Sequence, residues 1–219
     1  RCIGRQLLQT KRRGSIGVDP ARYGDDDMVI TVMESGRILE RKIIPSCSAP
    51  EGCSQVAILQ KQYFPDGQIA IAVDCDGLGG PYLDLLKQMI PDQLKCKYVE
   101  VHGASTDKEK IDTDHQNLRS EMAFYAKTEL EAGRICLDDD PYTREEATSE
   151  QYFINPKGKM QIEDKDDIKE LLGRSPDRWD SLKLAIWGLK SAEQINPKDR
   201  WRQIEQPKEE ISFMGVRII

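Results

Sequence analysis

The sequence lacks the marks of several common classes of protein. It has only two histidines and six cysteines, and no two cysteines form a CxxC pair, so no zinc site is expected. No apolar run is long enough to cross a membrane, and no secretory signal is present. The GxxxxGK[ST] phosphate loop of many ATPases is missing as well. The scattered thiols are typical of a protein from a reducing compartment.

Charge is distributed unevenly along the 219 residues. The net charge is -6, which argues weakly against a free-standing nucleic-acid binder, because such proteins usually present a basic surface. Residues 1–14 nevertheless carry five basic residues and no acidic one. The first residue is arginine rather than methionine, so we expect an excised piece of a longer protein. We expect a basic segment at 1–14, one domain at 15–190 and a polar, proline-interrupted surface tail at 191–219.

Strand-like and helix-like segments alternate within the expected domain. Apolar runs predict strands at 16–18, 28–33, 38–44, 68–73 and 97–101. Helical patterns predict helices at about 56–63, 81–89, 117–133 and 176–190. We also expect a short edge strand at 135–137 and hairpin turns at ESG and NPKG. This order predicts an α/β fold in which a mixed sheet carries helices on both faces.

Aspartates stand at three places where a carboxylate needs a partner. Asp19 ends the first strand, and Asp74 ends the buried strand IAIAV. Asp177 and Asp180 lie three residues apart in the first turn of the last helix, where the helix dipole favours negative charge. If the first and fourth strands are neighbours, Asp19 and Asp74 repel each other. A hard divalent cation with oxygen ligands relieves that repulsion, so the pattern predicts a metal site.

Other polar residues are expected to be structural. Asp25, Asp26 and Asp27 are interpreted as turn residues, and the run at 138–140 as a solvated loop. His102 and His115 have no partner nearby in the sequence and receive no role.

Three segments in this order, GVDPARYGDDDMVI, IAVDCDGLGG and SPDRWDSLKLA, resemble the C-terminal nuclease domain of the large terminase subunit of tailed bacteriophages. The resemblance covers roughly residues 14–190. It implies an RNase H-like fold and a divalent-metal-dependent DNA endonuclease that follows a packaging ATPase and cuts concatemeric viral DNA in the host cytoplasm. The partners it implies are double-stranded DNA, the ATPase domain of the same chain, the portal and the small terminase subunit, with no membrane.

The same resemblance implies roles for particular residues. The ligands of two Mg²⁺ or Mn²⁺ ions would be Asp19, Asp74 and Asp180, with Asp19 bridging both ions. Asp177 would be an accessory ligand, or would hold the other ligands in place without contacting an ion itself. Trp179 and Ser181 stand where the family often has small residues, so the packing around them is expected to differ. Basic side chains near these motifs are expected to contact DNA, namely Arg22, Lys165, Arg174 and Arg178.

Two other functions remain compatible with the sequence. One is a Holliday-junction resolvase or transposase-type nuclease of the same fold, although such resolvases often carry strongly basic patches. The other is a non-catalytic RNase H-like module that only docks to another subunit. Repulsion among the aspartates further predicts that Asp180→Asn raises the melting temperature of the metal-free protein.

Overall fold

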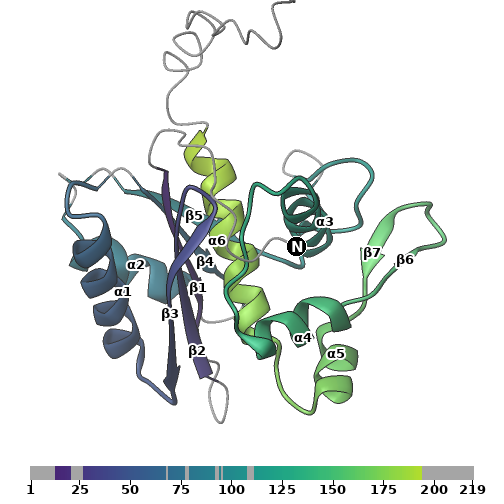
Figure 1. Cartoon of the computed structure of the whole chain (residues 1–219), viewed down its shortest axis with the longest axis horizontal. Helices are drawn as coiled ribbons and strands as arrows, with labels where there is room; N and C mark the ends of the chain where they lie inside the picture. Colours follow the sequence, from purple (N-terminus) through teal and green to yellow (C-terminus); the bar gives the residue numbers. More distant parts are fainter. Residues whose placement is uncertain are drawn as a thin grey trace, which may run out of the picture.

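The structure is a computed structural model that describes residues 13–20, 27–67, 69–76, 79–91, 94, 96–107 and 111–193 (Figure 1). Arg22, Asp25, Asp26 and most of the two expected terminal segments lie outside the described residues. In the described part of the chain, no helix combines the length and the apolar character that crossing a membrane requires.

A five-stranded mixed sheet lies at the centre of the fold. Its strands in spatial order are β3 (Arg37–Pro45), β2 (Asp27–Glu34), β1 (Gly14–Asp19), β4 (Ile69–Asp74) and β5 (Lys97–Val101). The β3–β2–β1 half is antiparallel, and β4 and β5 continue from β1 in parallel. Ser35 and Gly36 make the tight turn between β2 and β3 with positive φ angles of 49° and 84°. The expected mixed sheet is therefore confirmed.

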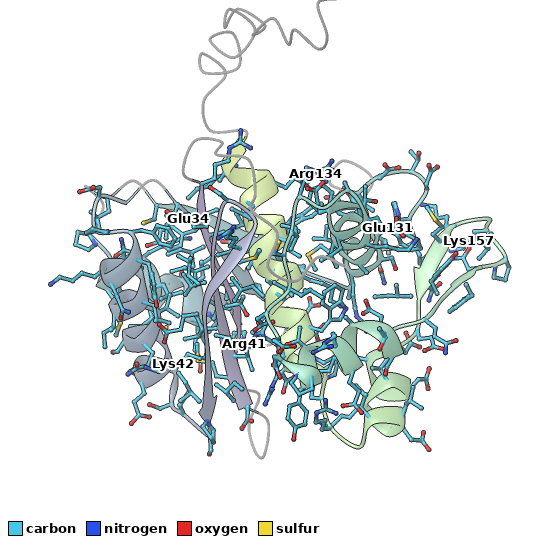
Figure 2. The ribbon with its side chains drawn as sticks, in the orientation of Figure 1. Glu34, Arg41, Lys42, Glu131, Arg134 and Lys157 are labelled. Carbon is cyan, nitrogen blue, oxygen red and sulfur yellow. The ribbon has the colours of Figure 1, made fainter. Side chains whose placement is uncertain are left out.

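Helices cover both faces of the sheet (Figure 1). One face packs against α1 (Ala49–Tyr63) and α2 (Gly79–Met89), and the other against α3 (Leu118–Glu131) and α6 (Asp177–Glu193). Two helices that the sequence did not predict, α4 (Pro141–Ser149) and α5 (Lys165–Leu172), lie beyond α6. The hairpin of β6 (Tyr152–Ile154) and β7 (Met160–Ile162) was expected and carries Lys157 at the outer edge of the molecule (Figure 2).

Side chains of β1 alternate between the two layers of helices. Ile16 and Val18 belong to the core under α1 and α2. Ser15 instead donates a 2.7 Å hydrogen bond to a backbone carbonyl of α6, and a Cβ at Gly17 would collide with the α6 backbone. Because successive strand residues point to opposite faces, Asp19 lies on the same side as Ser15 and Gly17. The glycine thus lets α6 approach closely enough for its first turn to reach Asp19.

Local structure differs from the sequence expectations in four places. Helix α1 begins at Ala49 rather than at about residue 56, and Asp27, interpreted as a turn residue, begins β2. Residues 135–137 form no strand, because only an isolated bridge joins Cys136 to Arg37. The last helix begins at Asp177 rather than Pro176, whose carbonyl instead accepts the N–H of Asp180 at 2.9 Å.

Candidate active site

Two strand ends bring Asp19 and Asp74 to one edge of the sheet. β1 and β4 are parallel neighbours in which Val18 pairs with Val73, and each aspartate is the next residue. Asp74 lies on the same side of β4 as Ala72, which packs against α6. Both carboxylates are thus on the α6 side of the sheet, at the carboxyl ends of adjacent strands.

The first turn of α6 supplies Asp177 and Asp180 to the same edge. Glu146 of α4 fixes this turn, because its buried carboxylate accepts the backbone N–H of Trp179 at 2.9 Å. This role of Glu146 was not predictable, since Glu146 lies in a polar helix that its residue pattern did not reveal. We call Asp19, Asp74, Asp177 and Asp180 the aspartate cluster.

The ammonium group of Lys165 lies among the carboxylates of this cluster. Lys165 begins α5, and its Nζ is 2.8 Å from Oδ2 of Asp180. The same nitrogen is 3.9 Å from Oδ1 of Asp177 and 4.0 Å from Oδ2 of Asp19. Burial alone would lower the pKa of Lys165, but Asp180 and Asp19 raise it above its usual value, so the group is a cation at neutral pH.

Asp19 and Asp180 respond in opposite ways to this shared environment. Burial raises the pKa of Asp19 well above its usual value, and Lys165 only partly opposes that rise. The other members of the cluster raise the pKa of Asp19 further. Burial would also raise the pKa of Asp180, but Lys183 and Lys165 together hold it below its usual value. The lysines thus favour the ionised form of Asp180, whereas burial disfavours the ionised form of Asp19.

Asp74 is tied to the turns that follow β4 and β5. Its Oδ1 accepts the N–H of Asp76 at 2.9 Å. Burial raises the pKa of Asp74, the Asp76 N–H bond lowers it, and Asp180 contributes to the rise. Asp76 in turn lies 3.7 Å from Nδ1 of His102, a residue to which the sequence assigned no role.

Residue types in the cluster fit a hard divalent cation. All four members are carboxylates, which are the oxygen donors that Mg²⁺ and Mn²⁺ prefer. The Lys165 ammonium stands in for a cation, since it lies at the point where the carboxylates of the cluster attract positive charge. In the arrangement described, no three His, Cys, Asp or Glu side chains among the described residues are close enough to hold a metal ion. The assignment of Asp19, Asp74 and Asp180 as ligands thus stays a prediction, as does the accessory role of Asp177.

Known proteins share this architecture, although no family model matches the sequence. The nuclease domain of the large terminase subunit gp2 of bacterial virus Sf6 superimposes with a TM-score of 0.67 and 15% identity, over 81% of this chain and 89% of that one. The large terminase nuclease of thermophilic phage G20c with bound magnesium gives a TM-score of 0.56 and 15% identity, over 82% of each chain. The chain has the RNase H-like fold of a terminase nuclease domain.

A sequence relative agrees with this terminase nuclease fold. The probable large terminase subunit of Enterobacteria phage P7 is 30% identical over 128 residues, which are 56% of this chain and 24% of the relative. The chain therefore spans about a quarter of the length of the curated relative that it matches. The resemblance to terminase large subunits found in the sequence is confirmed.

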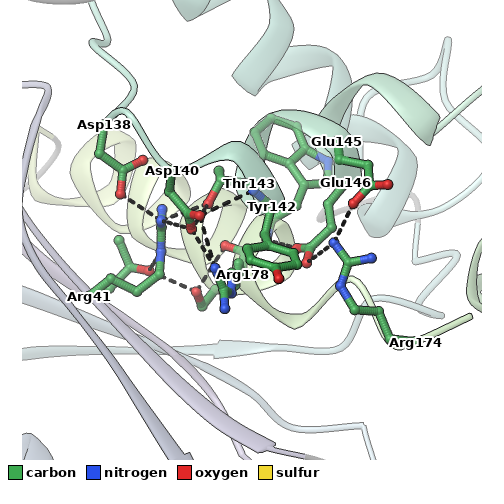
Figure 3. Close-up of polar contacts among 12 residues, drawn as sticks. Arg41, Asp138, Asp140, Tyr142, Thr143, Glu145, Glu146, Arg174 and Arg178 are labelled. Carbon is green, nitrogen blue, oxygen red and sulfur yellow. Dashed lines mark hydrogen bonds and ion pairs between the residues drawn. The ribbon is translucent and has the colours of Figure 1, made fainter. Parts of the chain in front are cut away.

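Two arginines of the terminase-like domain that were expected to contact DNA are engaged inside the protein (Figure 3). Arg178 donates to both carboxylate oxygens of Asp140 at 2.8 and 2.9 Å, and Arg174 donates to Glu145 at 2.8 Å. Both guanidinium groups also lie over the ring of Tyr142. Their contact with DNA stays a prediction, and it would have to compete with these pairs.

The run at 138–140 is not simply the solvated loop that the sequence suggested. Arg41 extends from β3 toward α4, and its side chain is only 6% exposed (Figures 2 and 3). Its Nη1 donates to Asp138 at 2.6 Å, to Asp140 at 3.2 Å and to Thr143 at 2.6 Å. Asp140 also caps the N-terminus of α4, since its side chain accepts the N–H of Tyr142. Only Asp139, with its side chain 81% exposed, fits the original interpretation.

Proposed function

We propose that this chain is a divalent-metal-dependent DNA endonuclease that cuts concatemeric viral DNA during genome packaging. The observation that carries the proposal is the convergence of three carboxylates on the Lys165 ammonium, beside Asp74, in a terminase nuclease fold. Similar domains have been described with magnesium or manganese, which supports the choice of cation.

Each residue of the cluster has a proposed part in this reaction. Asp19, Asp74 and Asp180 hold the cation, and Asp177 orients the attacking water or supports a second cation. Divalent cations held by these carboxylates would supply Lewis-acid chemistry, which activates water and stabilises the leaving oxygen of a phosphodiester. Lys165 keeps the carboxylates together in the metal-free protein and withdraws when the cation binds, because an ammonium and a dication cannot share this small space.

The acidic character of the chain suits a nuclease that is delivered to DNA by a larger assembly. Affinity for DNA rises with the number of phosphates that Lys and Arg neutralise. With a net charge of -6 and Arg174 and Arg178 paired internally, we expect weak binding by this chain alone. An ATPase domain in the full-length protein, the portal and the small terminase subunit are the proposed partners, in the host cytoplasm.

A nicking assay on supercoiled plasmid tests the proposal. The parent protein should cut in Mn²⁺ or Mg²⁺, should be inactive in excess chelator, and should treat plasmids of unrelated sequence alike. Asp19→Asn should abolish cutting, whereas Asp139→Asn, which changes an exposed carboxylate outside the cluster, should not. Full activity in chelator would overturn the metal requirement. A strong preference for four-way junctions would favour a resolvase, and a folded protein that neither cuts nor binds Mn²⁺ would favour a docking module.

A further inference from the structure

A fully buried lysine lies directly behind the aspartate cluster. Lys183 is one helical turn after Asp180 on α6, and its side chain is 2% exposed. Its Nζ is 2.9 Å from Oδ1 of Asp180, the oxygen that does not face Lys165. Each oxygen of Asp180 therefore pairs with a different lysine, Oδ2 with Lys165 and Oδ1 with Lys183.

Glu150 holds Lys183 in place from the opposite side. Its Oε1 accepts from Nζ of Lys183 at 2.6 Å, and its Oε2 accepts from the indole N–H of Trp179 at 2.9 Å. The Glu150 side chain is 6% exposed, and the Lys183 ammonium also lies 5.6 Å from the centre of the Trp179 ring. Charged groups at this depth keep one geometry, because any other arrangement would leave a buried charge unpaired.

We propose that Lys183 and Glu150 are positioning residues that lock Oδ1 of Asp180, so that only Oδ2 is presented to a metal ion. This inference rests on the proposed function, because it assigns Asp180 as a ligand. Lys165 is only partly buried, at 34% exposed, and can leave Oδ2, whereas Lys183 has no route to solvent comparable to that of Lys165. Asp180 would thus bind through one oxygen in a fixed direction.

A double variant separates this positioning role from a simple charge effect. Lys183→Met together with Glu150→Gln removes one positive and one negative charge, so the net charge of the chain is unchanged and neither residue of this pair keeps a charge without the other. Arg119, 3.7 Å from Oε1 of Glu150, also loses this carboxylate, so Glu150→Gln alone is measured beside the double variant. The matched control is Lys190→Met with Glu121→Gln, an ion pair at 3.2 Å that joins α6 to α3 and does not touch the cluster. Mn²⁺ affinity is measured by titration calorimetry, with melting curves to verify folding.

We expect the double variant to bind Mn²⁺ about 10–100-fold more weakly, the range usual for residues that orient metal ligands. Its nicking should need correspondingly more Mn²⁺, with the KM for DNA unchanged, and the control pair should match the parent. A folded double variant that binds Mn²⁺ within about twofold of the parent would overturn the positioning role while leaving the proposed function intact. A parent that binds no Mn²⁺ would overturn both.

A second measurement does not depend on how well the variant folds. In a crystal structure of the parent protein with Mn²⁺, Oδ1 of Asp180 should stay within hydrogen-bonding distance of Lys183 while Oδ2 alone contacts the metal. An Asp180 that binds through both oxygens, or that turns away from Lys183, would contradict the proposal.

Discussion

Nζ of Lys165 lies 2.8 Å from Oδ2 of Asp180, so an ammonium from α5 occupies the space in front of a carboxylate from α6. The two residues are also near Asp19 and Asp177, which makes Lys165 the counter-charge of a mostly buried acidic cluster. A cation that competes for this cluster must displace Lys165. The metal-free and metal-bound states are therefore linked through one side chain.

Lys165→Ala should strengthen Mn²⁺ binding, because the metal no longer competes with an ammonium. We expect a gain of about tenfold, equivalent to about 1.4 kcal/mol. The metal-free variant should melt a few degrees lower than the parent, since repulsion among the carboxylates is no longer opposed. Calorimetric titration and melting curves with and without Mn²⁺ measure both effects.

Lys169→Ala is the matched control for this change, since Lys169 is an exposed lysine one turn later on α5. It should leave Mn²⁺ affinity unchanged. Equal or weaker Mn²⁺ binding by Lys165→Ala would show that Lys165 does not compete with the metal.

The strands that carry the site were predictable because their signals are local. Short apolar runs marked β1 and β4, and each run ended in an aspartate, so Asp19 and Asp74 could be placed at strand ends. Asp177 and Asp180 were recognisable from helix spacing in the same way. These positions follow from short-range periodicity, which the chain displays directly.

Pairings between distant residues were not predictable from the sequence. Lys183 and Glu150 are separated by 33 residues, and nothing in a single sequence indicates that a lysine on an apolar helix face meets a glutamate. Helix α4, PYTREEATS, has only two buried residues, Thr143 and Glu146, so it lacks the apolar stripe that reveals a helix. Lys165 was expected to contact DNA, because the sequence does not indicate that its ammonium group lies near the carboxylates of the aspartate cluster.

Asp180→Asn and Asp19→Asn should change the stability of the metal-free protein in opposite directions. Asp180 accepts from two ammonium groups, so its loss leaves Lys165 and the buried Lys183 short of a partner. We expect a fall in melting temperature of roughly 4–8 °C. Among the described residues, the ion pair of Asp19 with Lys165 is long, at 4.0 Å, and burial raises the pKa of Asp19, so Asp19→Asn should raise the melting temperature by a few degrees.

Melting curves of both variants in excess chelator at neutral pH measure this contrast. This expectation differs from the one drawn from the sequence, in which Asp180→Asn relieves repulsion and raises the melting temperature. A stabilised Asp180→Asn protein would restore that expectation and would contradict the ion pairs described for Asp180.

Glu146 should make stability fall as the pH rises. Burial raises its pKa above the ordinary 4.5, although the Trp179 N–H bond and Arg174 oppose the rise. The folded state therefore holds this proton more tightly than the unfolded state, and the stabilisation is present below pH 4.5 and lost as the pH rises through the folded pKa. Glu146→Gln cannot titrate, so its melting temperature relative to the parent should increase by roughly 2–4 °C from acidic to neutral pH.

Melting curves of parent and Glu146→Gln across this pH range, in chelator, test the sign. The exposed Glu145→Gln is the control, and its difference from the parent should not follow this trend. If the melting temperature of Glu146→Gln instead falls relative to that of the parent toward neutral pH, folding lowers the pKa of Glu146.

Arg41 and Arg144 both pair with aspartates of the 138–140 run, but only one pair should matter for stability. Arg41 is 6% exposed and reaches Asp138 and Asp140, whereas Arg144 is 49% exposed and pairs with Asp139, itself 81% exposed. Removing a buried partner leaves carboxylates short of a counter-charge, so Arg41→Met should destabilise the protein by roughly 2–3 kcal/mol. Arg144→Met should melt within about 1–2 °C of the parent, because exposed ion pairs contribute little.

Denaturant unfolding of both variants measures these changes in stability, and repeating it at low and high salt tests whether each ion pair is buried. The effect of Arg41→Met should persist in high salt, since a buried pair is poorly screened, whereas any small effect of Arg144→Met should vanish. Asp140, a partner of Arg41, caps α4, and Glu146 of α4 fixes the first turn of α6. Since that turn carries Asp177 and Asp180, loss of Arg41 should also weaken Mn²⁺ binding. Unchanged stability in Arg41→Met would mean that this network neither holds α4 on the sheet nor supports the aspartate cluster.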